Sequence, residues 1–185
     1  MNINKIIREK KLVIPLLGAP GITLSNTNLK ENLINPEMQY KSLSMLIDKF
    51  CPDGIFPMMD LTVEVESLGL KLDFPQNNNP SVAEHPIKNE EDLKILKNKW
   101  QGIAGRMKVF IDVMEKIAKK YSIIKGGYVI GPFTMAGELM GSTDISIGVM
   151  LNPKFILEVL DFSVQIISEY AHACLLYTSP SPRDS

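Results

Sequence analysis

The sequence has no surplus of basic residues. Its 20 lysines and arginines are balanced by 21 aspartates and glutamates, which gives a formal net charge of −1 at pH 7. A protein that binds nucleic acid needs extra cations to neutralise phosphate groups. The charge balance therefore argues against DNA or RNA as a partner.

Long uncharged apolar stretches are missing as well. No segment approaches the roughly 20 apolar residues that a bilayer-spanning helix needs, so we expect no membrane-embedded part. The run Leu12–Leu17 follows several basic residues in the manner of a signal peptide. However, Pro15 and Pro20 interrupt it and no small-residue cleavage site follows. We expect this run to form a first buried strand instead.

Cysteine is scarce, and metal-binding spacings are absent. The two cysteines, Cys51 and Cys174, lie far apart in the sequence, which favours reduced thiols in a cytoplasmic protein. The sequence has no CxxC or HExxH pattern. We therefore name no metal ligand within this chain.

Strand-like and helix-like segments alternate along the 185 residues, of which 45% are apolar, enough for the core of one domain. Helix starts are indicated by Asn35-Pro36-Glu37, by Asn89 followed by three acids, and by Asn152-Pro153. The segment 106–121 is strongly amphipathic, and 74–86 has the composition of an irregular loop. This order favours an α/β fold with parallel strand pairing. The expected core faces of the first and last helices comprise Leu43, Leu46, Ile47 and Phe50, and Ile156, Val159, Leu160, Ile167 and Tyr170.

Asp60 directly follows an apolar run, Ile55–Met59, which is typical of a strand buried on both faces. The carboxyl ends of such strands carry the active sites of α/β barrels and open α/β sheets, so Asp60 is a candidate catalytic residue. The alternative is that Asp60 caps a helix. Glu64 would share its helical face four residues later, which makes Glu64 a better candidate for substrate binding than Glu66.

A second apolar run, Tyr128–Ile130, ends in Gly131-Pro132-Phe133-Thr134. Thr134 and Glu138 have the spacing of neighbours on one helical face, at the end of what we expect to be the third strand. Both are candidate substrate-binding residues.

These features together resemble the uroporphyrinogen decarboxylase superfamily, from Val13 to about Cys174. The resemblance rests on Asp60 with Leu68-Gly69, on the helix start Glu90–Leu93 and on Gly131–Thr134, in this order and spacing. It implies the N-terminal part of a (β/α)8 TIM barrel. In the decarboxylase, the acid that matches Asp60 accepts hydrogen bonds from pyrrole N–H groups and stabilises the positive charge of the protonated ring.

Two differences between this sequence and the decarboxylase argue against tetrapyrrole decarboxylation. The decarboxylase carries an arginine-rich segment where this chain has Leu17–Leu24, which contains no arginine. A substrate with many carboxylates needs such cations. Glu138 stands where the decarboxylase has a tyrosine, and its negative charge would repel a polyacid further.

The segment Val63–Glu66 is more similar to the corrinoid-dependent methyltransferases of the superfamily. The resemblance to this branch implies transfer of a methyl group from a methylcorrinoid, carried on a partner protein, to a small thiol such as coenzyme M. In that branch a zinc ion holds the thiol as thiolate, so the resemblance implies zinc ligands, a His-x-Cys pair and a later cysteine, in the distal half of the barrel. Tetrapyrrole decarboxylation and an inactive fragment remain the alternatives.

The last helix should lead to a fourth strand after about Cys174, yet Leu175–Ser185 is polar and broken by prolines. These residues resemble a translated sequencing adapter. We therefore expect a partial barrel domain over 1–174 and a non-native or disordered tail over 175–185. A complete barrel takes about 250 residues, which agrees with truncation before the fourth strand. The alternative is a natural tail on a smaller α/β domain.

Overall fold

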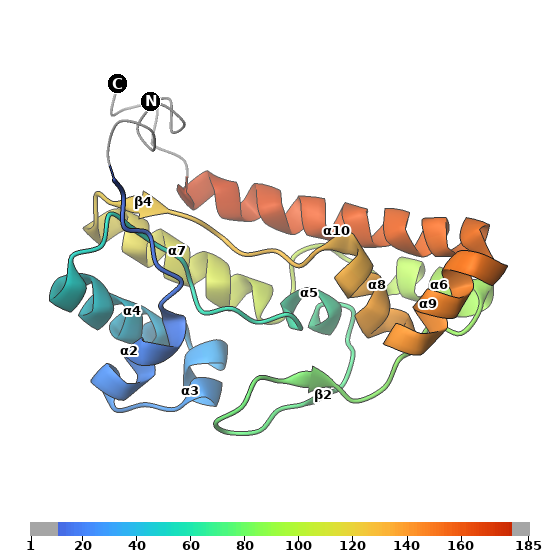
Figure 1. The fold of residues 1–185 in the computed structure, drawn as a ribbon, viewed down its shortest axis with the longest axis horizontal. Coiled ribbons are helices and arrows are strands. Elements are labelled where there is room, and N and C mark those ends of the chain that lie inside the picture. The colour runs from blue at the N-terminus through green and yellow to red at the C-terminus, as the bar shows by residue number, and fades with distance from the viewer. Residues whose placement is uncertain (1–10, 179–185) are drawn as a thin grey trace.

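A computed structural model describes residues 11–178 (Figure 1). Its helices are α2 (Gly18–Ser25), α3 (Leu29–Ile34), α4 (Pro36–Phe50), α5 (Val63–Glu66), α6 (Glu90–Lys99), α7 (Met107–Lys120), α8 (Pro132–Met140), α9 (Ser142–Leu151) and α10 (Pro153–Thr178). Its strands are β1 (Gly54–Ile55), β2 (Leu72–Asp73), β3 (Ser81–Val82) and β4 (Ile124–Lys125). The fold is a helix-rich α/β fold, and no helix within these residues has the length and apolar character needed to cross a bilayer.

β1 and β4 form a parallel pair in which Gly54 lies opposite Ile124 and Ile55 opposite Lys125. The connection between them contains α7, as expected for parallel strands joined by a crossover helix. The predicted parallel pairing is confirmed. It brings the two segments that end in Asp60 and in Gly131–Thr134 next to each other.

The pairing is shorter than predicted. Ile55–Met59 is paired only at Ile55, and Tyr128–Ile130 lies beyond the paired residues of β4. Pro57 explains the early end, because it has no N–H group to continue the hydrogen bonds between the strands. Gly126 donates the last of these bonds to the Ile55 carbonyl at 3.1 Å.

Leu12–Leu17 is not a buried strand. Val13 and Leu16 are exposed, with 62% and 68% of their surface accessible. Val13 nevertheless lies beside β1, because its N–H donates to the Asp53 carboxylate at 2.7 Å and its carbonyl accepts from the Asp53 N–H at 2.9 Å. The segment therefore runs along the sheet without joining it in a regular ladder.

The helix starts predicted from local signals are confirmed. The Asn35 side chain accepts from the N–H groups at the start of α4, and Asn89 does the same for α6. Of the expected core faces of α4 and α10, Leu160 is half-buried and all others except Phe50 are buried. The prediction that Phe50 is buried is wrong. Phe50 ends α4 and is 55% exposed, and the Lys49 ammonium lies over its ring, 5.5 Å from the ring centre.

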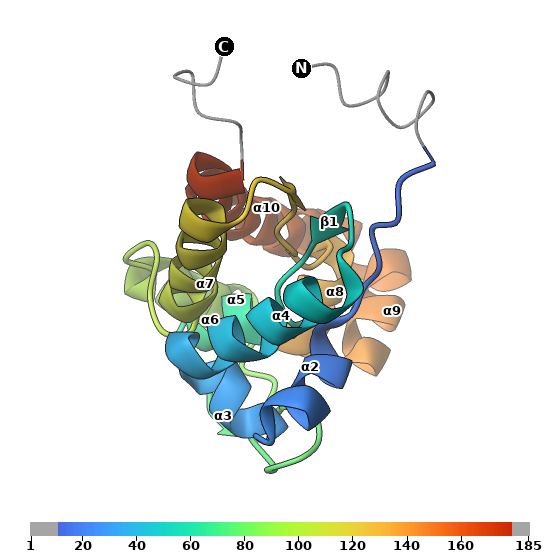
Figure 2. The same cartoon turned by 90° about the vertical axis from the view of Figure 1, so that its left-hand side faces the viewer.

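The helices form a series of packed neighbours. α2 and α3 pack against α4, α4 packs against α7, and α7 packs against α10, which also contacts α8 and α9. Figure 1 shows α10 running along most of the molecule, and Figure 2 shows the helices from one end. The interior contains a large core under α10 and a smaller one between α4, α7 and β1. The predicted loop 74–86 is mostly irregular, but Ser81–Val82 pairs with Leu72–Asp73 as an antiparallel hairpin.

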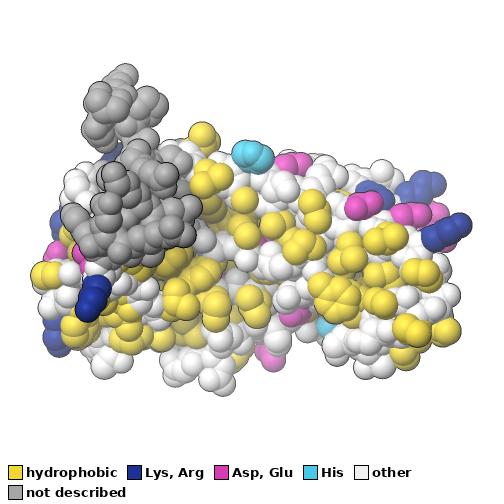
Figure 3. Space-filling model, turned by 45° about the horizontal axis from the view of Figure 1, so that its top comes forward, with side chains coloured by type: hydrophobic (Ala, Val, Ile, Leu, Met, Phe, Trp, Pro, Cys, Tyr) yellow, Lys and Arg dark blue, Asp and Glu magenta, His cyan; other side chains and the backbone are white. Residues whose placement is uncertain are grey.

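α10 extends to Thr178, four residues beyond the predicted helix end near Cys174. The origin of residues 175–185 stays a prediction, and 179–185 lie outside the described residues. Apolar side chains are exposed over several elements of the described part, and Figure 3 shows such side chains spread over one face. The exposed apolar residues of the described part include Met59, Leu61, Val129, Phe133, Ile147, Val149, Met150, Leu151, Leu157, Val164, Leu175 and Leu176.

Candidate functional site: two buried carboxyl groups

Asp60 lies at the end of the extended segment that continues β1, and its side chain is fully buried. One carboxylate oxygen accepts from both the N–H (2.8 Å) and the hydroxyl (2.7 Å) of Thr62. Helix α5 begins only at Val63, with Thr62 as its N-cap. The interpretation of Asp60 as a helix cap is therefore wrong.

The second oxygen of Asp60 forms an ion pair with the Arg106 guanidinium, whose side chain is only 6% exposed. Arg106 also donates to the Thr62 hydroxyl at 2.8 Å and to the Glu66 carboxylate at 2.6 Å. The Phe74 ring covers the guanidinium at 4.8 Å. The planar fork of an arginine suits several acceptors at once, which a lysine could not match.

Arg106 is the residue of this candidate site that the sequence analysis missed. It stands at the start of an amphipathic helix, where a basic residue is usually solvated. One signal was available: Arg106 is the only arginine among residues 11–178, whereas lysines are frequent there. Its role depends on partners 40 and 46 residues away in the sequence.

Glu64 occupies a different environment, although it lies close to Asp60 in the sequence. It is 1% exposed, and one carboxyl oxygen accepts from the Ile130 N–H at 3.0 Å. The other oxygen has no hydrogen-bond partner among the described residues. Burial raises the pKa of Glu64 from 4.5 to about 7, and the hydrogen bond from Ile130 opposes this only in part. Glu64 therefore carries a proton for much of the time at neutral pH.

Tyr170 and Cys174 of α10 contribute to the surroundings of Glu64. Both are buried, and burial is the main cause that raises the pKa of each. The pKa of Cys174 reaches about 11, although a hydrogen bond with Tyr170 lowers it and the nearby Glu64 raises it. Cys174 is therefore a neutral thiol near neutral pH, and no disulfide involves it. Glu66 points to Arg106, so Glu64 and Glu66 face different ways as predicted.

Thr134 and Glu138 are brought together, but not with Asp60. Both line a cavity of about 350 Å³ with His85, Phe133, Gly137, Ser142, Ile145 and Ser146. Burial raises the pKa of Glu138, and the neighbouring His85 partly opposes this shift. The His85 imidazole is held by the Glu138 backbone carbonyl, 2.8 Å from its Nδ1. A role of Thr134 and Glu138 in substrate binding stays a prediction.

The described residues do not fit a zinc ion. Nowhere between residues 11 and 178 do three or more His, Cys, Asp or Glu side chains gather as a metal site would require. Asp60 and Glu66 share one ion-pair partner, Arg106, and Glu64 faces a neutral thiol and a neutral phenol. This part of the chain can hold a proton on Glu64 and keep a carboxylate fixed at Asp60.

Curated relatives of the chain are methyltransferases. It is 28% identical over 143 residues to the methylated-thiol–coenzyme M methyltransferase of Methanosarcina mazei, covering 70% of this chain and 37% of the relative. It is 32% and 30% identical to the methylcobamide:CoM methyltransferases MtbA of Methanosarcina mazei and Methanosarcina acetivorans, in each case covering 62% of this chain and 34% of the relative. The chain thus spans about a third of the length of these relatives.

The fold is similar to that of a solved methyltransferase from Methanosarcina mazei. The TM-score is 0.73 at 20% sequence identity, over 86% of this chain and 48% of that structure. The likeness at this identity concerns the fold alone. The model of the uroporphyrinogen decarboxylase (URO-D) family matches residues 20–178, which is most of the chain. The chain therefore belongs to the uroporphyrinogen decarboxylase family.

Proposed function

We propose that this chain is the N-terminal part of a barrel enzyme that transfers a methyl group from a methylcorrinoid to a small thiol such as coenzyme M. A partner protein carries the corrinoid. The proposal is supported by relatives that are named as coenzyme M methyltransferases, two of them with methylcobamide as the second substrate.

The state of Arg106 is the observation that carries this choice over tetrapyrrole decarboxylation. A substrate with many carboxylates needs free cations, preferably arginines. The one arginine among residues 11–178 is buried between Asp60, Thr62 and Glu66 and is not available to a ligand. A thiol and a methylcorrinoid make no such demand on this part of the protein.

Asp60 is the residue we assign to the centre of the site. It fixes Arg106, and through it Glu66 and Thr62, at the carboxyl end of the β1 segment. The Glu64 carboxyl accepts a hydrogen bond from the Ile130 N–H, directly before the start of α8. We propose that Glu64, Thr134 and Glu138 contact the substrate; burial raises the pKa of both carboxyl groups, to about 7 for Glu64.

Zinc, when bound, would lower the pKa of a thiol and make it a nucleophile at neutral pH. Residues 11–178 contain no group of ligands that could hold the metal. We propose that its ligands belong to a distal part of the natural protein and that residues 175–185 are not part of it.

The test begins with the source DNA. Sequencing across the codons for 174–185 and onward should reveal a reading frame with a His-x-Cys pair and a later cysteine. The protein encoded by that frame should demethylate methylcobalamin when coenzyme M is added, followed by absorbance and by mass spectrometry of the methylated thiol. A chelator should abolish this activity, and Asp60→Asn should reduce it less.

Tetrapyrrole decarboxylation predicts the opposite pattern. Carbon dioxide would be released from uroporphyrinogen without a metal, and Asp60→Asn would remove most of the activity. Such a result, or a frame without further ligands, would reject the methyl transfer.

A third possibility is that the 185-residue chain is inactive by itself. Its exposed apolar side chains support this possibility, because such surfaces promote association; Met150 and Leu151 are each 80% exposed. We expect this chain to self-associate in sedimentation experiments. A monomer that unfolds cooperatively would contradict the proposal that it is part of a larger barrel.

A further inference from the structure

A fully buried glutamine connects the helices to the segment that ends in Asp60. Gln39 lies on α4, is 0% exposed and uses both ends of its side-chain amide. Its Nε2 donates to the Asn32 carbonyl at 2.9 Å, and its Oε1 accepts from the Met58 N–H at 3.1 Å. Because one partner is an acceptor and the other a donor, only this orientation of the amide satisfies both.

The Met58 N–H needs such a partner because the strand pairing ends before it. The last hydrogen bond of the pairing goes to the Ile55 carbonyl, and Pro57 has no N–H group to donate another. Met58 is 2% exposed, so its N–H would be buried without a partner if Gln39 were absent. Within the described part of the chain, this is the only hydrogen bond of the backbone over residues 56–59.

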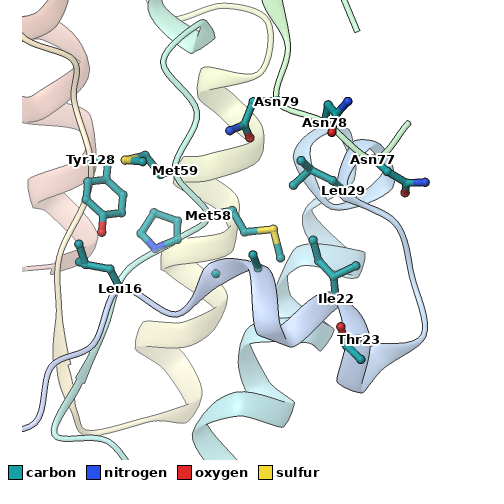
Figure 4. A pocket seen from close by; sticks show the side chains of 13 residues that line it. Leu16, Ile22, Thr23, Leu29, Met58, Met59, Asn77, Asn78, Asn79 and Tyr128 are labelled. Carbon is teal, nitrogen blue, oxygen red and sulfur yellow. The ribbon is translucent and has the colours of Figure 1, made fainter. Parts of the chain in front are cut away.

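Packing holds this segment on one side only. α2 approaches Met58 closely, since a Cβ atom on Gly18 would lie 2.9 Å from it. Met58 and Met59 also line a cavity of about 460 Å³ whose lining contains no charged side chain (Figure 4). Figure 4 shows the Met58 side chain directed towards Ile22 of α2, and Met59 on the side of Tyr128. The contact with α2 therefore holds the side chain of Met58, whereas Gln39 holds its backbone.

Gln39 is itself held by a buried polar network between α2, α3 and α4. The Nδ2 of its partner Asn32 donates to the Thr27 hydroxyl at 2.7 Å, and the Oδ1 accepts from the Ser42 hydroxyl at 2.7 Å. The Ser42 and Ser25 hydroxyls lie 2.6 Å apart. Within the described residues, no buried side-chain atom of this network lacks a partner. A fully satisfied network is rigid, and it gives Gln39 a fixed position.

Asp60 follows Met58 by two residues, and its carboxylate is bound by Thr62 and Arg106. We propose that Gln39 is a positioning residue, which sets through the Met58 N–H where the Asp60 carboxylate meets Arg106. Gln39 acts through the backbone of the segment and not on a reacting group. The inference deepens the function proposed above, because it rests on Asp60 as the centre of that site.

The Thr62 N–H reports the position of the Asp60 carboxylate, to which it donates at 2.8 Å. Gln39→Met keeps the length of the side chain and lacks the amide. Hydrogen exchange of the 185-residue chain, resolved to single residues by mass spectrometry, should be about tenfold faster at Thr62 in the variant, relative to the buried Ile166 of α10. An unchanged ratio of the two rates would overturn the proposal, even if Met58 alone exchanged faster.

Ser42→Ala is the matched control. Ser42 is equally buried on the same helix and belongs to the same network, but its hydroxyl bonds to Asn32 and Ser25 and not to the β1 segment. The change should weaken the network and leave the ratio of Thr62 exchange to Ile166 exchange as in the wild type. A tenfold rise of this ratio in the control as well would make the effect a general one of the network, and the proposal would fall.

Gln39→Glu supplies a rescue that pH can switch. A neutral carboxyl group donates to the Asn32 carbonyl and accepts from the Met58 N–H as the amide does, whereas a carboxylate cannot donate. Compared with the wild type at the same pH, the Thr62 ratio should be unchanged at about pH 5 and about tenfold higher at about pH 9. Equal ratios at both pH values would contradict the role of Gln39. This comparison remains decisive if Gln39→Met does not fold.

The two proposals fail independently because hydrogen exchange measures structure and not turnover. A changed Thr62 ratio without methyl transfer by the protein from the longer reading frame would reject the reaction and keep the role of Gln39. Where methyl transfer occurs, Gln39→Met should lower kcat by no more than Asp60→Asn does, and the double variant should lose nothing further. Additive losses in the double variant would reject positioning through Asp60 and leave the methyl transfer in place.

Discussion

Asp60 and Glu64 are two buried carboxyl groups on one short segment, and the protein treats them in opposite ways. Asp60 faces Arg106 and Thr62, so each of its oxygens has a partner and its charge is balanced. Glu64 faces the Ile130 N–H and the neutral side chains of Tyr170 and Cys174, and its pKa rises to about 7. The difference shows that an ion pair with Arg106 accompanies burial at Asp60, whereas burial is the main cause that raises the pKa of Glu64.

The largest effect is expected from removing that guanidinium. Arg106→Ala leaves Asp60 and Glu66 without their common partner, and Asp60 stays buried. Breaking one side of a buried ion pair typically lowers the free energy of unfolding by about 3–5 kcal/mol. Denaturation by urea measures this loss. Lys88→Ala is the control, because its pair with Asp144 is exposed, and it should change stability by less than about 1 kcal/mol.

The second prediction concerns the pH dependence that Glu64 causes. Its raised pKa means that the folded protein holds this proton more tightly than the unfolded chain does. The resulting stability is complete below about pH 4.5, falls as the pH rises towards about 7 and is lost above that value. The difference amounts to about 3 kcal/mol.

Glu64→Gln mimics the protonated carboxyl and cannot titrate. Urea denaturation should therefore show the variant gaining about 3 kcal/mol relative to the wild type between about pH 4 and pH 8. Glu158→Gln changes an exposed glutamate of α10 and should follow the wild type at both pH values. Parallel curves for wild type and Glu64→Gln would show that Glu64 is charged in the fold, like Asp60.

The smallest effect is expected for Tyr170. Tyr170→Phe removes a buried hydroxyl that interacts with Cys174, and the net value of such a hydrogen bond is about 1 kcal/mol. Tyr121→Phe removes an exposed hydroxyl that donates to Asp48 at 2.9 Å and should change less. A loss well above that of Tyr121→Phe, such as about 3 kcal/mol, would mean that Tyr170 supports the Glu64 carboxyl directly.

Features that depend on neighbouring residues could be predicted from the sequence. The caps at Asn35 and Asn89 act within one helical turn, so their signal is local. The place of Asp60 at the end of the β1 segment followed from the apolar run before it. The length of the strand pairing did not, because Pro57 interrupts hydrogen bonds to a partner about 70 residues away. The exposure of Val13 and Leu16 depends in the same way on which elements cover them.

The sequence by itself determined the parallel pairing of two apolar segments, the helix starts and the segment that carries both carboxyl groups. Local hydrogen bonds and the spacing of apolar residues encode these features. Only the tertiary structure decided that Arg106 reaches Asp60, that α10 places Tyr170 and Cys174 around Glu64, and that an uncharged cavity lies beside Met58. Charge and protonation depend on contacts between distant segments, since burial and ion pairing arise only when those segments meet.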